Sequence, residues 1–174
     1  MTNETILTPR EAEALDNHAE QQARAQLRAI REMIAAADID WQRLEELRDM
    51  AQEEKENPED GNKLDIEERE ELAELEEQAG EYASQEEAEE AIYNNPLDIQ
   101  YRSGWASSAE DLEPEEFSIL LCTGGPAVRI VGELGNHGEP CRAWLEYQDW
   151  GTPWTMLFDG QSDALDYAQR VICL

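Results

Sequence analysis

Glutamate is concentrated in residues 67–78, which read EEREELAELEEQ. A carboxylate can act as a general acid or base, or it can serve as a fixed negative charge that attracts a basic partner. Acid–base catalysis needs a carboxylate that an apolar setting distinguishes from its neighbours, and nothing in this run distinguishes one. The run therefore favours a role for the charge itself.

The density of charge in this run is close to that of nucleic acid. A helix rises about 1.5 Å per residue, so the run would span about 18 Å, with a net charge every 3 Å or so. One strand of B-DNA carries a charge about every 3.4 Å. The run also contains like-charge pairs at the i,i+4 spacing, namely Glu67 with Glu71 and Glu70 with Glu74. A lysine at the second position of each pair would stabilise the helix instead. We interpret the run as a mimic of a phosphate strand; the alternatives are a solvated helix face and a disordered acidic segment.

Cysteine and histidine do not form a catalytic or metal-binding pattern. His137 and Cys141 are close in sequence, but zinc needs three or four ligands, and His18 is the other histidine of the chain. The segment 123–126, TGGP, lacks the lysine and the hydroxyl residue of a phosphate-binding loop. We expect no metal, no cofactor and no enzymatic activity.

The composition restricts the class of partner. The net charge is -29, and Lys55 and Lys63 are the two lysines beside eleven arginines. Such a charge disfavours direct binding to nucleic acid or to an anionic membrane, and it indicates either a basic partner or a halophilic setting. Three cysteines in no framework spacing indicate reduced thiols in a cytoplasm. We expect neither a signal peptide nor a membrane-spanning segment.

Residues 1–95 have the apolar spacing of helices. Thr8-Pro9-Arg10-Glu11 is a helix start, and an apolar stripe follows at spacings of three and four from Ala12 to Ala37. A second helix is expected after Asp40, and a third from about Asp65, with Glu68 in a capping box and Leu72, Leu75, Ala79 and Tyr82 as its stripe. A short fourth helix should start at Ser84 and run to about Tyr93, before Asn94-Asn95-Pro96 stops it.

After Pro96 the apolar period changes to that of strands. FSILLC at 117–122 and AVRIVGEL at 127–134 flank the turn at 123–126, and CRAWLEY at 141–147 alternates. Residues 97–102 and 155–158 are shorter candidate strands, and a last helix should begin at Ser162. The sequence therefore predicts an α+β fold, with an acidic domain of three to four helices at 1–95 and an antiparallel sheet with a C-terminal helix at 96–174.

Aromatic residues are crowded between Trp144 and Phe158. Stacking on single-stranded nucleic acid needs a positive groove, which this acidic half does not offer. Core packing accounts for some of them, while a tryptophan that stays exposed in a loop would anchor a partner. The candidate anchors are Trp150, Trp154 and Trp105.

The second half resembles a family of small uncharacterised proteins of temperate phages and prophages of Gram-negative bacteria. The resemblance is carried by RSGW at 102–105, LLCTGGPAVRIVGEL at 120–134 and LEYQDWGTPWT at 145–155. It implies a phage accessory protein that acts in the cytoplasm of a bacterial host.

Two functional hypotheses follow. The first is an inhibitor of a host defence nuclease complex, of the anti-CRISPR or anti-restriction type, that occupies a basic DNA-binding groove as an acidic DNA mimic. The second is a non-catalytic phage assembly module that forms a homodimer through the stripe of its first helix and binds a partner through its aromatic C-terminal loop. The acids assigned to the first hypothesis are Glu67, Glu70, Glu71, Glu74, Glu77, Glu86, Glu87 and Glu90.

Overall fold

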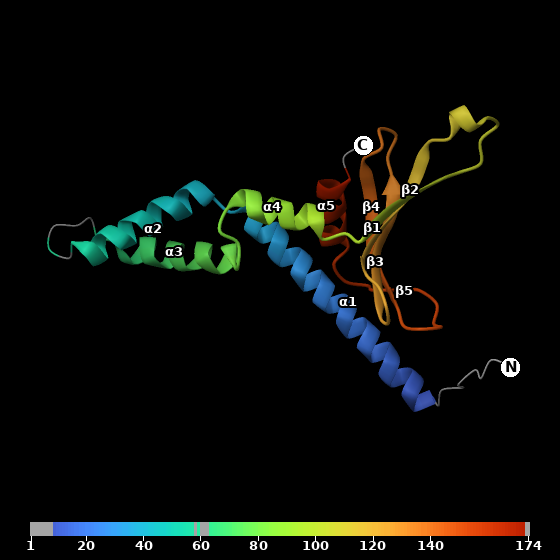
Figure 1. Cartoon of the computed structure of the whole chain (residues 1–174), viewed down its shortest axis with the longest axis horizontal. Coiled ribbons are helices and arrows are strands. Elements are labelled where there is room, and N and C mark those ends of the chain that lie inside the picture. The colour runs from blue at the N-terminus through green and yellow to red at the C-terminus, as the bar shows by residue number, and fades with distance from the viewer. Residues whose placement is uncertain (1–8, 58, 60–62, 173–174) are drawn as a thin grey trace. The chain divides into compact units, whose positions relative to one another are not determined.

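The computed structural model describes residues 9–57, 59 and 63–172, with side chains from His18 onward except that of Asp111. Helices come first, a five-stranded antiparallel sheet follows, and a helix ends the described chain, so the predicted α+β class is confirmed (Figure 1). The chain forms two compact units. One contains the residues up to Ile30 together with those from Ile92 onward, and the other contains Arg31–Ala91.

The sheet is a meander in which each strand pairs with its neighbour in sequence. The hairpin between β2 and β3 turns at the predicted TGGP segment. Close to prediction, the strands are β1 (Asp98–Ser103), β2 (Pro114–Cys122), β3 (Ala127–Leu134), β4 (Pro140–Gln148) and β5 (Thr155–Met156).

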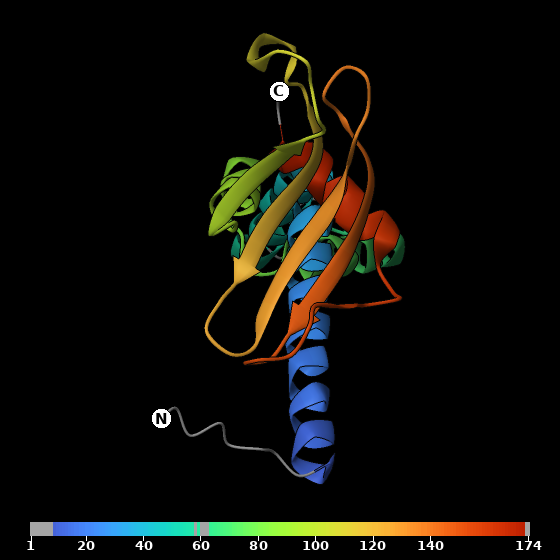
Figure 2. The same ribbon diagram turned by 90° about the vertical axis from the view of Figure 1, so that its right-hand side faces the viewer.

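One face of the sheet forms the core of its unit. α5 (Gln161–Val171) crosses this face, and the part of α1 (Pro9–Asp38) up to Ile30 lies on the same side (Figure 2). The predicted alternation in β4 holds for Ala143, Leu145 and Tyr147, whereas Cys141 is exposed near the start of the strand. Strand side chains buried on the covered face are Phe117, Ile119, Leu121, Val128, Ile130, Ala143, Leu145 and Tyr147.

A glycine permits the close approach of α1 to the start of α5. Gly160 precedes α5 with a φ of 75°, a left-handed conformation that favours glycine. A Cβ atom there would lie 2.5 Å from both methyl carbons of Leu27 on α1. On α5 itself, the hydroxyl of the buried Tyr167 accepts a hydrogen bond of 2.8 Å from Asn95.

The apolar stripe of α1 is buried within the chain. Its described members include Ala19, Ala23, Leu27 and Ile30, all at most 2% exposed. Further along, Met33 is buried and Ile34 is half-buried. The stripe is therefore not the free surface that dimerisation through the first helix would need; Ala12 and Leu15 lie outside the residues whose side chains are described.

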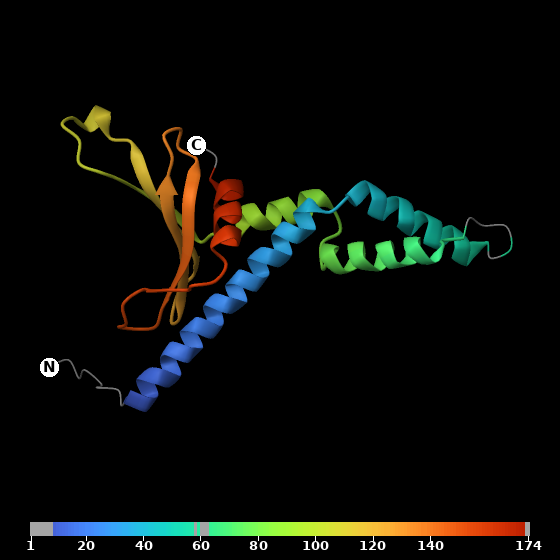
Figure 3. The ribbon, with the colours of Figure 1, turned by 180° about the vertical axis from the view of Figure 1, so that it is seen from behind.

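The other unit is built mainly from three short helices. α2 (Trp41–Glu56) and α3 (Ile66–Ala79) form an antiparallel hairpin, and α4 (Gln85–Asn94) follows (Figure 3). The predicted capping box of α3 is present, because Asp65 accepts from the backbone N–H of Glu68 and Glu68 accepts from that of Asp65. α3 ends at Gly80, so Tyr82, expected on its stripe, lies beyond the helix.

The grouping of the elements differs from a division at residue 95. The first part of α1 belongs with the sheet, because its narrow stripe is buried there against elements that follow much later in the sequence. Sequence periodicity identifies which residues form a stripe, but it does not identify the element that covers them.

Candidate functional site

Ion pairs between α2 and α3 use every arginine of the hairpin. Arg43 Nη2 lies 2.8 Å from Glu71 Oε2, and a second pair joins Arg69 to Glu54 at 2.6 Å. Arg48 is 3.5 Å from Glu76. The hydrogen bond to Glu71 raises the pKa of the Arg43 guanidinium, and burial partly opposes this. The arginines of the two helices thus pair with acids of the hairpin itself.

This pairing corrects the assignment of Glu71. It was predicted to present its charge to a partner, but it is half-buried and bonded to Arg43. Arg43 is 28 positions away in sequence, so a like-charge count along α3 does not reveal it.

The remaining predicted acids of α3 form one outward row. Glu67, Glu70, Glu74 and Glu77 are exposed, and their carboxylates form no hydrogen bond or ion pair with the described residues. Their spacing places them on one side of the helix, away from the residues that bridge to α2. Four charges over about 15 Å are one per 5 Å or so, which is sparser than the count over the whole run.

A second acidic row lies on α2 and was not among the predicted site residues. Glu45, Asp49, Glu53 and Glu56 are exposed and recur at i, i+4, i+8 and i+11. Arg43 and Glu54 bridge to α3 from the other side of α2, so this row also points away from the hairpin partner. Two packed helices are about 20 Å across, which separates the two rows by roughly the width of a duplex.

The predicted acids of α4 have different environments. Glu86, Glu87 and Glu90 are all exposed. Glu87 caps its own helix, because its carboxylate accepts from the backbone N–H of Ala83 at 2.8 Å while Ser84 Oγ accepts from the N–H of Glu87. Glu86 lines a shallow hollow that also contains Trp41 and Arg48.

The lysines of the chain flank the loop of the hairpin. Lys55 lies in the last turn of α2, and Lys63 lies shortly before α3; both are exposed.

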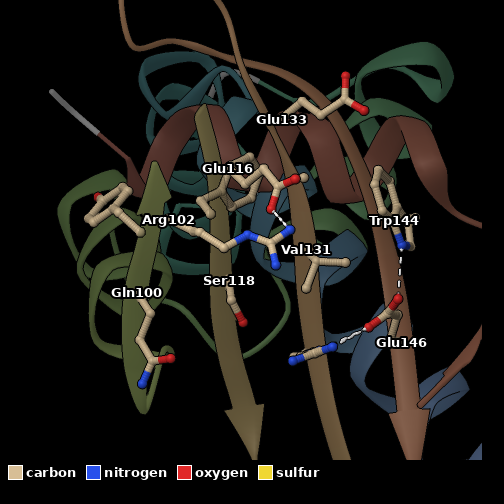
Figure 4. A pocket seen from close by; sticks show the side chains of 12 residues that line it. Gln100, Arg102, Glu116, Ser118, Val131, Glu133, Trp144 and Glu146 are labelled. Carbon is tan, nitrogen blue, oxygen red and sulfur yellow. Dashed lines mark hydrogen bonds and ion pairs between the residues drawn. The ribbon is translucent and has the colours of Figure 1, made fainter. Parts of the chain in front are cut away.

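The uncovered face of the sheet bears arginine–glutamate pairs across neighbouring strands (Figure 4). Arg102 pairs with Glu116, and Arg142 pairs with Glu133 at 3.0 Å. The first pair and Glu133 of the second line a hollow of about 390 Å³, together with Val131. Charge is nearly balanced here, in contrast to the helical unit.

Trp154 belongs to this sheet face rather than to an exposed loop surface. The centroid of its ring lies 4.0 Å from the guanidinium carbon of Arg129, which pairs with Glu146 at 2.7 Å. The indole of Trp144 donates to the same glutamate at 3.2 Å. Trp154 is half-buried in this network, so its assignment as an exposed anchor is corrected to a packing role.

Trp105 and Trp150 remain exposed, as an anchor would. Trp105 lies in the β1–β2 loop and is fully exposed, while Trp150 lies in the β4–β5 loop and is 78% exposed. Trp150 rests on Gly125, where a Cβ atom would lie 1.9 Å from the indole. In an antiparallel meander these two loops are at opposite ends of the strands, so the two side chains cannot form one patch.

The cysteines and the possible metal ligands can be placed within the described residues. Burial raises the pKa of the Cys122 thiol, which makes it a poorer nucleophile. Within residues 18–57, 59 and 63–172, no three histidine, cysteine or acidic side chains converge as metal ligands.

Helices of the described chain are all too short or too polar to cross a bilayer. The acidic rows of the hairpin and the two exposed tryptophans are thus the surfaces from which a function can be argued. Comparison with family models, with curated proteins and with solved structures finds no match for this chain.

Proposed function

We propose that the protein is a non-enzymatic binding protein whose α2–α3 hairpin occupies a basic, nucleic-acid-binding surface of another protein. One observation carries this proposal: the hairpin pairs its arginines with its own glutamates and presents a row of exposed acids on each outer side. Such an arrangement concentrates negative charge at the outside of a structure about as wide as a duplex.

The mechanism is competition. Arginine and lysine residues that follow a phosphate backbone would contact carboxylates instead, and long-range attraction would accelerate the encounter. The resemblance of the second half to phage and prophage proteins makes a nuclease complex of bacterial defence the first partner to test. In that setting the protein acts in the host cytoplasm as an anti-CRISPR or anti-restriction inhibitor.

Capture from a bacterial lysate, followed by elution with short duplex DNA, tests the proposal. Proteins held in a nucleic-acid-binding groove should be released by the duplex, because duplex and hairpin compete for the same cations. Poly-glutamate at equal charge should release them less well, since it lacks the fixed spacing of the rows. Proteins that resist the duplex are bound elsewhere.

A pair of charge-matched variants locates the contact. The first variant reverses Glu67, Glu70, Glu74 and Glu77 to lysine, and the control reverses exposed acids of the sheet unit. Both variants change the net charge by the same amount. If both lose capture equally, binding depends on the overall charge of the protein, and the proposal of a specific surface on α3 is refuted. The control residues are Glu110, Glu113, Glu115 and Glu139.

The exposed tryptophans support a second candidate, an assembly module that binds through its loops. Trp105 and Trp150 have the size and exposure of interface anchors. If this module accounts for binding, Trp105→Ala or Trp150→Ala will abolish capture while the fourfold reversal on α3 leaves it intact. The hairpin proposal expects the opposite ranking.

A further inference from the structure

The outer edge of β1 is open for pairing with another strand. β1 is the first strand of the sheet and, within the part of the chain that the structure describes, pairs with β2 alone. An edge strand presents unpaired backbone N–H and C=O groups, which makes it a template for a further strand unless charges, proline or a bulge protect it. Four of its first five side chains are exposed, so the edge is accessible.

The two ends of β1 limit the length over which a strand could pair. A register shift interrupts the pairing of β1 between Arg102 and Ser103. Pro96, which has no backbone N–H, lies two residues before the strand. The usable edge is therefore Asp98–Arg102, which reads DIQYR.

This five-residue segment is complementary to itself when two copies run antiparallel. With Gln100 opposite its own equivalent, Asp98 faces Arg102 of the other copy, and this occurs twice because the arrangement is twofold symmetric. Ile99 then faces Tyr101, an aliphatic–aromatic pair of the kind that stabilises neighbouring strands. Moving the register by two residues would place both charges opposite glutamine or beyond the segment.

The side chains at this edge are suited to the pairing. The side chain of Arg102 contacts Glu116 but is still 76% exposed. Its guanidinium has enough N–H donors to bind a second carboxylate as well. Tyr101 is 42% exposed and Leu97 59% exposed, at the open border of the covered face. A second β1 would cover this apolar border and provide about four to six backbone hydrogen bonds.

We propose that two copies of this chain associate through antiparallel pairing of their β1 strands, in the register that sets Asp98 of each copy against Arg102 of the other. The pairing joins two five-stranded sheets into one continuous sheet. It is independent of the proposed function, because it uses neither the α2–α3 hairpin nor the exposed tryptophans.

Charge exchange at these two positions tests the register directly. In Asp98→Arg, arginines face each other at both sites, and in Arg102→Asp, aspartates do. Each variant should weaken the dimer about 10- to 30-fold in sedimentation equilibrium of the full chain. An equimolar mixture of the two variants pairs arginine with aspartate at both sites, so native mass spectrometry should show a heterodimer with affinity near that of the unaltered chain.

Two further variants separate register from general effects. The double variant Asp98→Arg/Arg102→Asp restores both opposite-charge pairs and should dimerise like the unaltered chain, which also shows that the substitutions permit folding. Arg142→Asp lies on the same sheet face but away from the edge, and it should not change the dimer.

Three results would overturn the proposal. One is an unaltered chain that remains monomeric to about millimolar concentration in about 0.3 M salt, where repulsion between the acidic copies is screened. Another is a dimer that neither single exchange weakens, which would place its interface elsewhere. The third is a mixture of the two single variants that does not form the heterodimer.

Discussion

Substitution of Gly160 by alanine tests the contact between Leu27 of α1 and the start of α5. Gly160 has a φ of 75°, and a left-handed residue other than glycine costs about 1–2 kcal/mol. The added Cβ would also lie 2.5 Å from both methyl carbons of Leu27. Overpacking of this kind costs about 1–3 kcal/mol, so Gly160→Ala should lower the free energy of unfolding by about 2–5 kcal/mol.

Gly151 provides the matched control. Its φ is also 75°, but no heavy atom lies within 4 Å of the position of a Cβ. Gly151→Ala should therefore cost only the conformational part, about 1–2 kcal/mol. Urea unfolding followed by tryptophan fluorescence measures both variants, and the difference between them isolates the clash.

A double-mutant cycle with Leu27→Ala identifies the neighbour responsible. Truncating Leu27 removes the methyl groups, so the excess cost of Gly160→Ala over Gly151→Ala should disappear in that background. Equal costs at the two glycines, or an excess that persists without the Leu27 methyl groups, would refute the contact as the cause.

Three further results are expected. Burial raises the pKa of Tyr167 to about 12, so the unfolded chain loses the phenolic proton first; the free energy of unfolding should fall by about 2–3 kcal/mol between pH 10 and 12, and Tyr167→Phe should remove this fall in urea titrations. Trp154→Ala should cost about 1–3 kcal/mol through loss of its packing on Arg129, whereas Trp105→Ala should stay within about 0.5 kcal/mol, measured by the same unfolding. Raising salt from about 0.05 to 0.3 M should weaken capture of basic proteins but strengthen the β1-paired dimer, because screening reduces both attraction to a partner and repulsion between copies.

Local signals in the sequence were sufficient for most elements. β3 has its predicted bounds, Ala127–Leu134, because a glycine-rich turn precedes a run that contains the β-branched residues Val128, Ile130 and Val131. The capping box at Asp65 and Glu68 likewise identified the start of α3, since both of its hydrogen bonds join residues within four positions.

The features of the candidate site that could not be predicted from the sequence all depend on contacts between residues that are distant in the chain. Glu71 looks identical to its neighbours until Arg43 of another helix is placed beside it. The outward row on α2 becomes recognisable once the direction of α3 is known, although its i,i+4 spacing is visible in the sequence. Trp154 resembled a loop residue because its contact with Arg129 forms only when β3, β4 and β5 are side by side.

The position of the two lysines affects how the protein can be attached to a surface. Reagents that react with amines would couple to Lys55 and Lys63, both of which flank the hairpin loop, and would hold the molecule by the acidic unit proposed to bind its partner. Cys141 offers a different attachment point, because its thiol is exposed on β4 in the sheet unit, whereas Cys122 is half-buried. Thiol coupling through Cys141, after substitution of Cys122 and Cys173 by serine, would leave both rows of carboxylates accessible to solution.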